Sequence, residues 1–388
     1  MSKIVHICLN GSYTDGFNYQ DNILPKYHKL LGLDVTVLAP QWCRNHDGEM
    51  VSNYENEYIN NDGIKVIRIP QKKKNRKPSY KFKIYPQLYS ILSKENPDII
   101  FFHNFQMFDS LTVTKYIKNN REVVLYIDNH SDYSNSASSF ISRNILHKLI
   151  WKYCAHKILP YTKKFYGVLP ARVDFLVSTY GLPKNKCELL LMGADDELLS
   201  KYSTSKWKNT IRKRFNVKAN DFLIVTGGKI DLFKTQTLTL LEAIKEVKNI
   251  NIKVIVFGSV VPQLKEQFNS FIDNKNMYYI GWLNAEESYK YFGAADLVVF
   301  PGRHSVYWEQ VVAQGIPMIC KYWAGTTHVD IGGNVRFLYK DTIESIKNEL
   351  LNIVYNKDIY NNMLESAMGD KHKEFMYSEI AKKSIELY

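Results

Sequence analysis

Two short stretches of the sequence place side chains that bind anions and hydroxyl groups directly after apolar runs. In "DFLIVTGGKIDLFKT", Lys229 and Lys234 stand five residues apart, just beyond the pair Gly227-Gly228. In "DLVVFPGRHSVYWEQ", Glu309 is the one formal negative charge after the Pro-Gly turn. Two lysines at the start of a helix suit a diphosphate, and a carboxylate can accept hydrogen bonds from two adjacent hydroxyls. Each stretch taken alone also fits an ordinary surface helix.

The elements that must position these residues follow from the hydrophobic pattern. Short apolar runs, among them "HKILPYT" (156–162), alternate with helical patterns and predict parallel strands buried on both faces. Two sets of such runs predict an α/β protein of two doubly wound, Rossmann-like domains. Because ligands bind beyond the carboxyl ends of parallel strands, we expect the domains to face each other across a cleft. The expected parts are an N-terminal domain (1–199), a linker (200–220), a C-terminal domain (221–370), and a C-terminal helix (371–388) that packs back on the first domain.

Length and composition exclude several classes of protein. The 388 residues exceed what one hydrophobic core usually fills. Five scattered cysteines without CxxC spacing predict free thiols in a reducing cytoplasm. No apolar stretch approaches the roughly 18 residues of a membrane span, so we expect a cytoplasmic chain. The sequence has no GxGxxG or P-loop motif and no DxD-type site, so we expect neither a nicotinamide cofactor nor a metal.

The formal net charge of +12 is unevenly distributed. Basic side chains are concentrated in the segments 72–83 and 139–164, and the second segment also carries an apolar stripe at helical spacing. For most of that stripe, packing into the core is the favoured interpretation. The charges fit either a solvated loop and helix face or a surface that meets an anionic membrane leaflet. The residues of the stripe are Ile141, Ile145, Leu149 and Tyr153.

Four longer stretches together resemble one enzyme family. "TGGKIDLFKT" is similar to a phosphate loop, "MYYIGWLNAEESYKYFGAADLVVFPG" to the stretch from the base-binding strand to the motif strand, and "VDFLVSTYGLPKNKCELLLMGAD" to the end of the N-terminal domain. "EQVVAQGIPMI" is similar to the segment that begins with the family's second motif glutamate. The family is the retaining family-4 glycosyltransferases of the GT-B fold, of the kind that build bacterial polysaccharide and lipopolysaccharide.

The resemblance implies roles for individual residues. Glu309 would bind the ribose of a nucleotide-sugar donor, and Lys229 and Lys234 would hold its diphosphate. One position departs from the family, because Pro301 stands where its first motif glutamate is expected. The implied catalytic residues are His130, Lys229 and Lys234, and His103 is a candidate on the acceptor side. The implied donor-binding residues are Gly16, Gly228, Lys229, Lys234, Gly281, Trp282, His304, Ser305, Val306 and Glu309.

The resemblance also implies an activity. We expect a metal-independent glycosyltransferase that moves a sugar from a nucleotide-diphosphate sugar to a glycan or lipid-diphosphate-linked acceptor, with retention of configuration. A UDP-sugar is favoured and a GDP-sugar is the competitor. Because the first motif glutamate is missing, an inactive partner subunit that regulates another transferase stays an alternative. A sugar epimerase would need an acid/base carboxylate that these motifs do not supply, and no nucleic-acid-binding module is recognisable.

Overall fold

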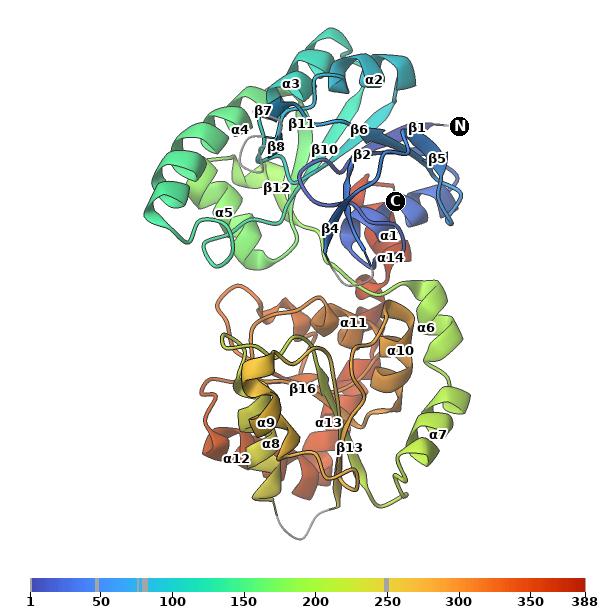
Figure 1. Ribbon diagram of the computed structural model, residues 1–388, viewed down its shortest axis with the longest axis vertical. Helices are drawn as coiled ribbons and strands as arrows, with labels where there is room; N and C mark the ends of the chain where they lie inside the picture. Colours follow the sequence, from blue (N-terminus) through green and yellow to red (C-terminus); the bar gives the residue numbers. More distant parts are fainter. Residues whose placement is uncertain (1, 46–48, 75–76, 79–82, 248–250, 388) are drawn as a thin grey trace. The chain divides into compact units, whose positions relative to one another are not determined.

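The computed structural model describes residues 2–387 apart from 46–48, 75–76, 79–82 and 248–250. Contacts divide the chain into two compact units. Unit 1 comprises the residues up to Leu191 together with Ile380–Tyr388, and unit 2 is Met192–Glu379. Each unit has a sheet with helices on both of its faces (Figure 1), which confirms the predicted fold class of two Rossmann-like α/β domains.

Unit 1 is built on an eight-stranded sheet in the order β12-β11-β10-β9-β1-β2-β6-β5. All neighbours are parallel except the edge pair β5 and β6. The chain builds the sheet outward from β1 to β2 and β6 on one side and from β9 to β12 on the other, so the topological switch point lies between β1 and β9. The strands are β1 (Lys3–Ile7), β2 (Asp34–Pro40), β5 (Glu57–Ile59), β6 (Lys65–Ile69), β9 (Ile99–His103), β10 (Val124–Asn129), β11 (Thr162–Gly167) and β12 (Cys187–Leu189).

Helices cover the sheet of unit 1 and enclose its core. Val5, Phe102 and Ile127, on three of the central strands, are fully buried, as expected for parallel strands covered on both faces. Two small hairpins join β3 (Trp42–Arg44) to β4 (Met50–Ser52) and β7 (Lys73–Lys74) to β8 (Lys77–Pro78). The helices are α1 (Gln20–Leu30), α2 (Leu88–Glu95), α3 (Ser110–Asn119), the π-helix η1 (Ser142–Trp151), α4 (Lys152–Ile158), the short 3₁₀ turns η2 (Leu159–Tyr161) and η3 (Lys184–Lys186), α5 (Pro170–Tyr180) and the end of α14 (Tyr377–Ser384).

Unit 2 has a six-stranded, fully parallel sheet in the order β15-β14-β13-β16-β17-β18. Its switch point lies between β13 and β16. The strands are β13 (Phe222–Gly227), β14 (Ile252–Phe257), β15 (Met277–Tyr279), β16 (Leu297–Phe300), β17 (Met318–Lys321) and β18 (Val335–Leu338). The helices are α6 (Asp196–Tyr202), α7 (Ser205–Arg214), α8 (Gln236–Lys245), α9 (Lys265–Asn269), α10 (Ala285–Ala294), α11 (Tyr307–Ala313), α12 (Ile343–Tyr355), α13 (Lys357–Met368) and the 3₁₀ turns η4 (Pro262–Leu264), η5 (Thr327–Val329) and η6 (Asp370–Phe375).

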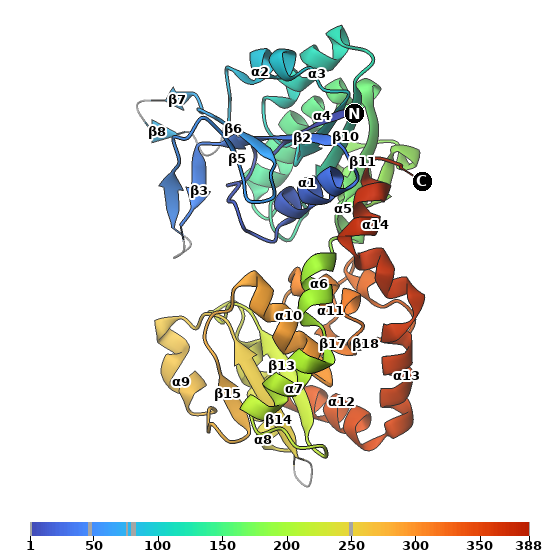
Figure 2. The same ribbon diagram turned by 90° about the vertical axis from the view of Figure 1, so that its right-hand side faces the viewer.

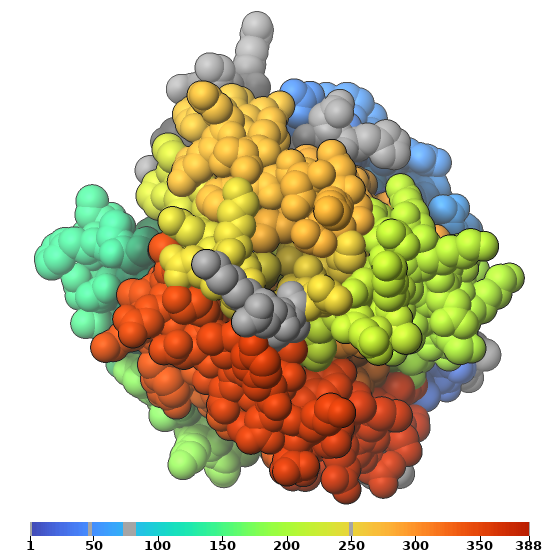
Figure 3. Space-filling view, turned by 90° about the horizontal axis from the view of Figure 1, so that it is seen from below, coloured from blue at the N-terminus to red at the C-terminus, as the bar shows by residue number. Residues whose placement is uncertain are grey.

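The units do not begin and end where the sequence predicted. Unit 2 starts at Met192 rather than after the expected linker, because α6 and α7 pack on α10. The Tyr202 hydroxyl donates to Glu286 at 2.6 Å, and Arg212 pairs with Asp296 at 2.9 Å. Helix α7, yellow-green in Figure 3, accordingly lies against the yellow and orange part of unit 2. Segment 200–220 is therefore an integral part of unit 2, and of the segment 371–388 only the residues from Ile380 onward join unit 1.

The segment 139–164 also differs from the prediction. The run "HKILPYT" forms the end of α4 and η2, and the strand begins only at Thr162. The expected core stripe faces outward, since Ile141, Ile145, Leu149 and Tyr153 are all at least 45% exposed. A second apolar face, with the buried Trp151 as a member, packs on the core instead. Parts of the basic segment 72–83 lie outside the described residues. Within the described ranges, no helix combines the length and the apolar character that crossing a membrane requires.

Candidate functional site

The two stretches with which the sequence analysis began come together in unit 2. Lys229 and Lys234 follow β13 in the sequence, and Glu309 lies on α11, the helix that follows β16. These two strands are neighbours in the sheet, paired through Ile224–Leu297 and Val225–Val298. Because the chain reverses its direction of winding here, both loops leave the carboxyl edge at the switch point of unit 2. In open α/β sheets this is where ligands bind.

The lysine loop carries positive charge just before a helix. Lys229 is exposed and its Nζ lies 3.3 Å from Asp231, while Lys234 is half-buried and α8 begins two residues after it, at Gln236. Although burial disfavours the charged form of Asp231, the backbone N–H of Phe233 and the nearby lysines lower the pKa of its carboxyl. Asp231 therefore neutralises part of the lysine charge, and the remainder is available to an anion at this edge.

Glycines allow the backbone to turn beside these lysines. Gly228 has a φ of 128° and Gly258 a φ of 116°, a region that favours glycine. A Cβ on Gly258 would lie 1.8 Å from the carbonyl oxygen of Gly228, so the two loops pass in contact. Gly258 also donates its N–H to the carbonyl of Gly281 at 2.7 Å. Gly228 and Gly281, both predicted for the donor site, are thus linked through Gly258, while Trp282 beside them is 70% exposed.

Glu309 is held by two histidines. His304 Nε2 donates to its Oε1 at 2.7 Å, and His328 Nε2 donates to the same oxygen at 2.9 Å. Burial by itself raises the pKa of this fully enclosed carboxyl, but the charge and hydrogen bond of His304, together with His328, outweigh that effect. They lower the pKa of Glu309 to about 2. The carboxylate is therefore ionised, and only its Oε2 has no partner among the described residues.

The remaining predicted residues of this loop lie around the helix start. Val306 is the N-cap of α11, and the backbone carbonyl of Ser305 accepts the N–H of Trp308 at 2.9 Å. Trp308 is fully buried and anchors the helix that carries Glu309. His328 lies in the 3₁₀ turn η5 after β17 and is not among the residues predicted for the donor site. No strand or helix pattern could have paired it with Glu309.

Unit 1 gathers a second set of polar residues at its own switch point. His103 ends β9, and His130 follows β10 directly. Between them lies Asp128, fully buried, with its Oδ2 2.7 Å from His103 Nδ1 and 3.3 Å from His130 Nε2. Burial raises the pKa of Asp128, but the two histidines outweigh this and hold it well below its usual range. Gly16, in the loop after β1, has a φ of 77° and open space around it.

The carboxylates of this second set were not predicted from the sequence. Asp128 is a charged residue inside the apolar run "EVVLYIDNH", and that placement was the available signal. Asp21 lies in the first turn of α1, and the charges of Asp128, His103 and His130 all affect the pKa of its carboxyl. Burial and the neighbouring Asp128 raise the pKa of Asp21, whereas that of Asp128 is lowered. Two carboxyls with opposite shifts are a feature of acid/base sites.

Both sets could also hold a cation. His103, Asp128 and His130 place three ligand-type atoms within 4.8 Å of one another, and so do His304, Glu309 and His328. Two imidazoles and a carboxylate are a donor set that zinc and similar ions accept. The expectation of a metal-independent protein therefore stays a prediction.

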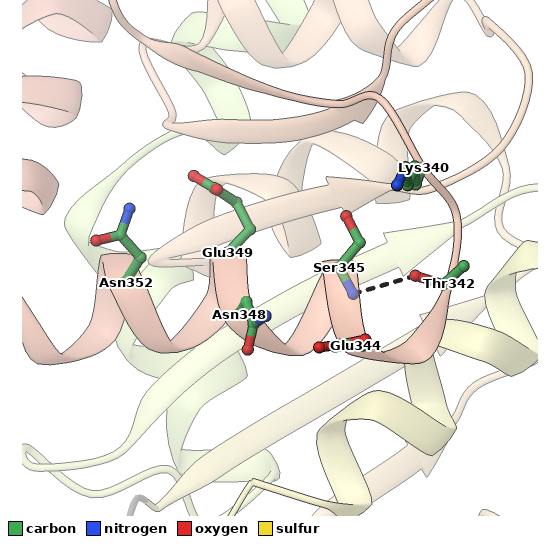
Figure 4. Close-up of a pocket in the computed structure, with 7 residues that line it drawn as sticks. All are labelled: Lys340, Thr342, Glu344, Ser345, Asn348, Glu349 and Asn352. Carbon is green, nitrogen blue, oxygen red and sulfur yellow. Dashed lines mark hydrogen bonds between the residues drawn. The ribbon is translucent and has the colours of Figure 1, made fainter.

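A surface hollow on α12 lies apart from both sets in the sequence (Figure 4). Its lining contains none of the predicted site residues, and Thr342 there caps the helix by accepting the N–H of Ser345 at 3.2 Å. We assign it no part in the site. The lining residues are Lys340, Thr342, Glu344, Ser345, Asn348, Glu349 and Asn352.

Solved structures share this fold over nearly the whole chain. A glycosyltransferase from Rickettsia africae is 14% identical, with a TM-score of 0.68 over 100% of this chain and 97% of its own. The Anabaena protein HepE in complex with UDP is 13% identical, with a TM-score of 0.71 over 99% and 98% of the two chains. The UDP-GlcNAc 2-epimerase of Neisseria meningitidis, bound to UDP-GlcNAc, is 12% identical, with a TM-score of 0.61 over 99% of each chain. At such identities the likeness shows the fold.

At the level of sequence, a family model matches part of the chain. Among curated proteins, none is significantly similar in sequence to this chain. Residues 22–198, however, match the sequence model of Glycosyltransferase Family 4. The matched segment contains β9, β10 and the set formed by His103, Asp128 and His130. The chain thus has the GT-B fold, and its residues 22–198, a little under half of its length, are similar to Glycosyltransferase Family 4.

Proposed function

We propose that the protein is a glycosyltransferase that takes a sugar from a nucleotide-diphosphate sugar, with a UDP-sugar favoured over a GDP-sugar. The observation that carries this proposal is the switch point of unit 2, where two lysines and an ionised, buried carboxylate follow neighbouring strands. The lysines suit the diphosphate, and Glu309 suits the ribose hydroxyls. HepE, which has the same fold, has been solved with UDP and with UDP-glucose.

The transfer itself needs stabilisation of the departing nucleoside diphosphate. Lys229 and Lys234 supply positive charge beside that leaving group, which is the electrostatic help that a transition state with a developing glycosyl cation requires. In the retaining mechanism that we propose, an oxygen of the departing phosphate takes the proton of the acceptor hydroxyl, so no protein base and no metal are required. The configuration at the anomeric carbon is then kept.

The test is nucleoside diphosphate release from UDP-glucose, UDP-N-acetylglucosamine and GDP-mannose, in the presence of EDTA and with water as the acceptor. We expect release from one nucleotide class. Lys234→Ala should abolish it, while the matched control Lys245→Ala, a lysine near the end of α8, should not change it. Proton NMR of the released sugar then reports the anomer, and an inverted anomer would contradict the retaining mechanism. Equal loss in both lysine variants would contradict the diphosphate site.

We further propose that the acceptor is a glycan or lipid-linked glycan of cell-surface polysaccharide assembly and that unit 1 docks on an anionic membrane leaflet to reach it. The supporting observation is the outward apolar stripe along η1 and α4, in which Ile141 and Leu149 are each 63% exposed, next to Phe140 at 78%. Arg143, Lys148 and Lys152 lie among these apolar side chains with no carboxylate in the segment. Apolar side chains flanked by cations match an interface of acyl chains and anionic headgroups.

Co-sedimentation with vesicles tests this docking. The wild type should bind vesicles that contain anionic phosphatidylglycerol and should release them at high salt, since each basic side chain contributes about 1 kcal/mol near such a surface. Leu149→Ser should weaken binding without changing the unfolding temperature, because the side chain is exposed. The control is Tyr355→Ser, an exposed aromatic residue on α12 of unit 2. Equal binding of both variants and of neutral vesicles would refute membrane docking.

A second candidate function is sugar epimerisation, for which the sequence motifs alone supply no acid/base carboxylate. Asp128, fully buried, and Asp21, half-buried, now supply carboxyls beside two histidines, and an epimerase of the same fold is among the similar structures. Incubating UDP-N-acetylglucosamine without an acceptor separates the two functions. An epimerase interconverts the intact nucleotide sugar, a transferase releases UDP slowly, and an inactive partner subunit does neither.

A further inference from the structure

A line of five hydrogen-bonding side chains crosses the interior of unit 1. Asp128 Oδ2 meets His103 Nδ1 at 2.7 Å, His103 Nε2 meets His6 Nδ1 at 3.0 Å, and His6 Nε2 meets His28 Nδ1 at 2.9 Å. The line ends where His28 Nε2 lies 2.8 Å from the Ser384 hydroxyl, at the point where α14 lies beside α1 (Figure 2). None of the five is more than 4% exposed. We call these residues the histidine chain.

The positions of the protons in the histidine chain follow from its ends. An ionised carboxylate only accepts, so the His103 Nδ1 facing Asp128 carries a proton. Burial lowers the pKa of His6 and of His28, so each of these rings is neutral and has a single N–H. The Ser384 hydroxyl donates to the Ala381 carbonyl at 2.8 Å, and His28 Nε2 lies 3.2 Å from the same carbonyl oxygen. His28 therefore donates through Nε2, so its Nδ1 accepts from His6 Nε2, and His6 Nδ1 accepts from His103 Nε2. His103 Nδ1 donates to Asp128 at the other end.

Asp128 is consequently fixed on both of its oxygens. Its Oδ1 accepts the backbone N–H of Asn104 at 2.8 Å, and its Oδ2 accepts from His103. The other group on Oδ2 is His130 Nε2, at 3.3 Å, and the side chain of His130 is 32% exposed. The backbone of His130 is held as well, since Asn135 donates to its carbonyl at 2.7 Å. The carboxyl of Asp21, the neighbouring acid, belongs to α1 and has a raised pKa, so it competes less for these donors.

We propose that Asp128, fixed by the histidine chain, is a positioning residue for His130. It holds the tautomer of His130 that carries the proton on Nε2, so that Nδ1 is left as an acceptor for a hydroxyl group of the bound sugar. A ring in the other tautomer would turn a lone pair toward the carboxylate and would offer a donor to the ligand. This inference rests on the proposed function for its sugar ligand, whereas the tautomer itself is independent of it.

The first experiment is long-range ¹H–¹⁵N NMR on the full chain with ¹⁵N-histidine, in which the resonance lost in His130→Gln identifies the ring. In the wild type His130 should be the Nε2–H tautomer, and in Asp128→Asn it should leave that tautomer. With the sugar nucleotide that the wild type hydrolyses, kcat should fall in Asp128→Asn by on the order of 100-fold, with KM little changed, because a misplaced group costs turnover more than binding. The control is Asp109→Asn. Asp109 is another buried aspartate of unit 1, and its Oδ2 accepts the backbone N–H of Tyr85 at 2.6 Å.

A second pair of variants tests the link through His103. His103→Asn keeps a donor near the position of Nδ1, whereas His103→Leu removes it. The asparagine should preserve the His130 tautomer and most of the turnover, and the leucine should lose both, so the proposal stays testable if Asp128→Asn does not fold. A wild-type His130 with its proton on Nδ1, or equal turnover in Asp128→Asn and Asp109→Asn, would overturn the proposal. If the wild type binds neither UDP nor GDP, the proposed function is contradicted. The NMR measurement of the His130 tautomer would still test the positioning role of Asp128.

Discussion

Glu309→Gln should remove a pH-dependent part of the stability of unit 2. Glutamine keeps the side-chain volume and an oxygen that His304 and His328 can reach, but it has no charge. The folded-state pKa of Glu309 is about 2 against 4.5 for a free glutamate. Each unit of pKa difference is worth about 1.4 kcal/mol, so ionisation of Glu309 contributes at most about 3.5 kcal/mol. Because the folded pKa is lowered, this stability is present above about pH 4.5 and is lost as the pH falls toward 2.

Urea unfolding of the wild type and Glu309→Gln at several pH values, from about pH 3.5 to 7, measures this contribution. The difference in free energy of unfolding should be constant at the upper values and should shrink at the lowest ones. Glu246→Gln serves as the control, since Glu246 forms a surface ion pair with Lys347 at 2.6 Å and its loss should change little at any pH. A difference that stays constant or grows on acidification would refute the assignment of Glu309 as an ionised residue held by two histidines.

Three further substitutions test the packing around the site by urea unfolding at neutral pH. Trp308→Ala should cost about 3–5 kcal/mol because the indole, next to Glu309 on α11, is fully buried; a loss below about 1 kcal/mol would contradict that packing. Gly258→Ala should destabilise unit 2 by at least about 1–3 kcal/mol and weaken nucleotide binding, since its Cβ would lie 1.8 Å from the Gly228 carbonyl; unchanged binding would argue against this loop as the phosphate site. Asp195→Ala should cost about 1 kcal/mol, because Asp195 caps α6 by accepting the N–H of Glu197 at 3.0 Å; no change would mean that the cap is replaced by water.

The sequence predicted the two sheets and the residues at the switch point of unit 2. Buried parallel strands have a strong local signal, and the residues that follow them are necessarily at the ligand edge. Lys229, Lys234 and Glu309 were therefore placed correctly after β13 and β16. The run "HKILPYT" was wrongly predicted to be a strand, because a short apolar run does not by itself distinguish a strand from a buried helix. The helix η1 has two apolar faces, and the sequence alone does not show which of them packs on the core.

The histidine chain and the partners of Glu309 were beyond the reach of sequence patterns. His6 and His103 come from β1 and β9, which lie side by side as parallel strands, and His28 joins them from helix α1. Asp128 joins them from the next strand, β10, through the pairing of Asp128 with His103. A buried histidine in a single strand is an ordinary core residue, and its role becomes visible only when the tertiary structure supplies its neighbours. The domain boundary failed for a similar reason, because the polar α7 is held by contacts with α10.

The central claim, that unit 2 binds a nucleoside diphosphate, is tested most directly by thermal unfolding of the wild type, Glu309→Ala and Lys234→Ala with UDP, GDP, CDP or ADP, with and without EDTA. A ligand at about 100 times its dissociation constant adds about 2.7 kcal/mol of stability, which is a readily measured shift in Tm. We predict that UDP, or GDP if the donor is a GDP-sugar, raises the Tm of the wild type. EDTA should not change this shift, and both variants should lose it. No shift with any of the four nucleotides would contradict the claim.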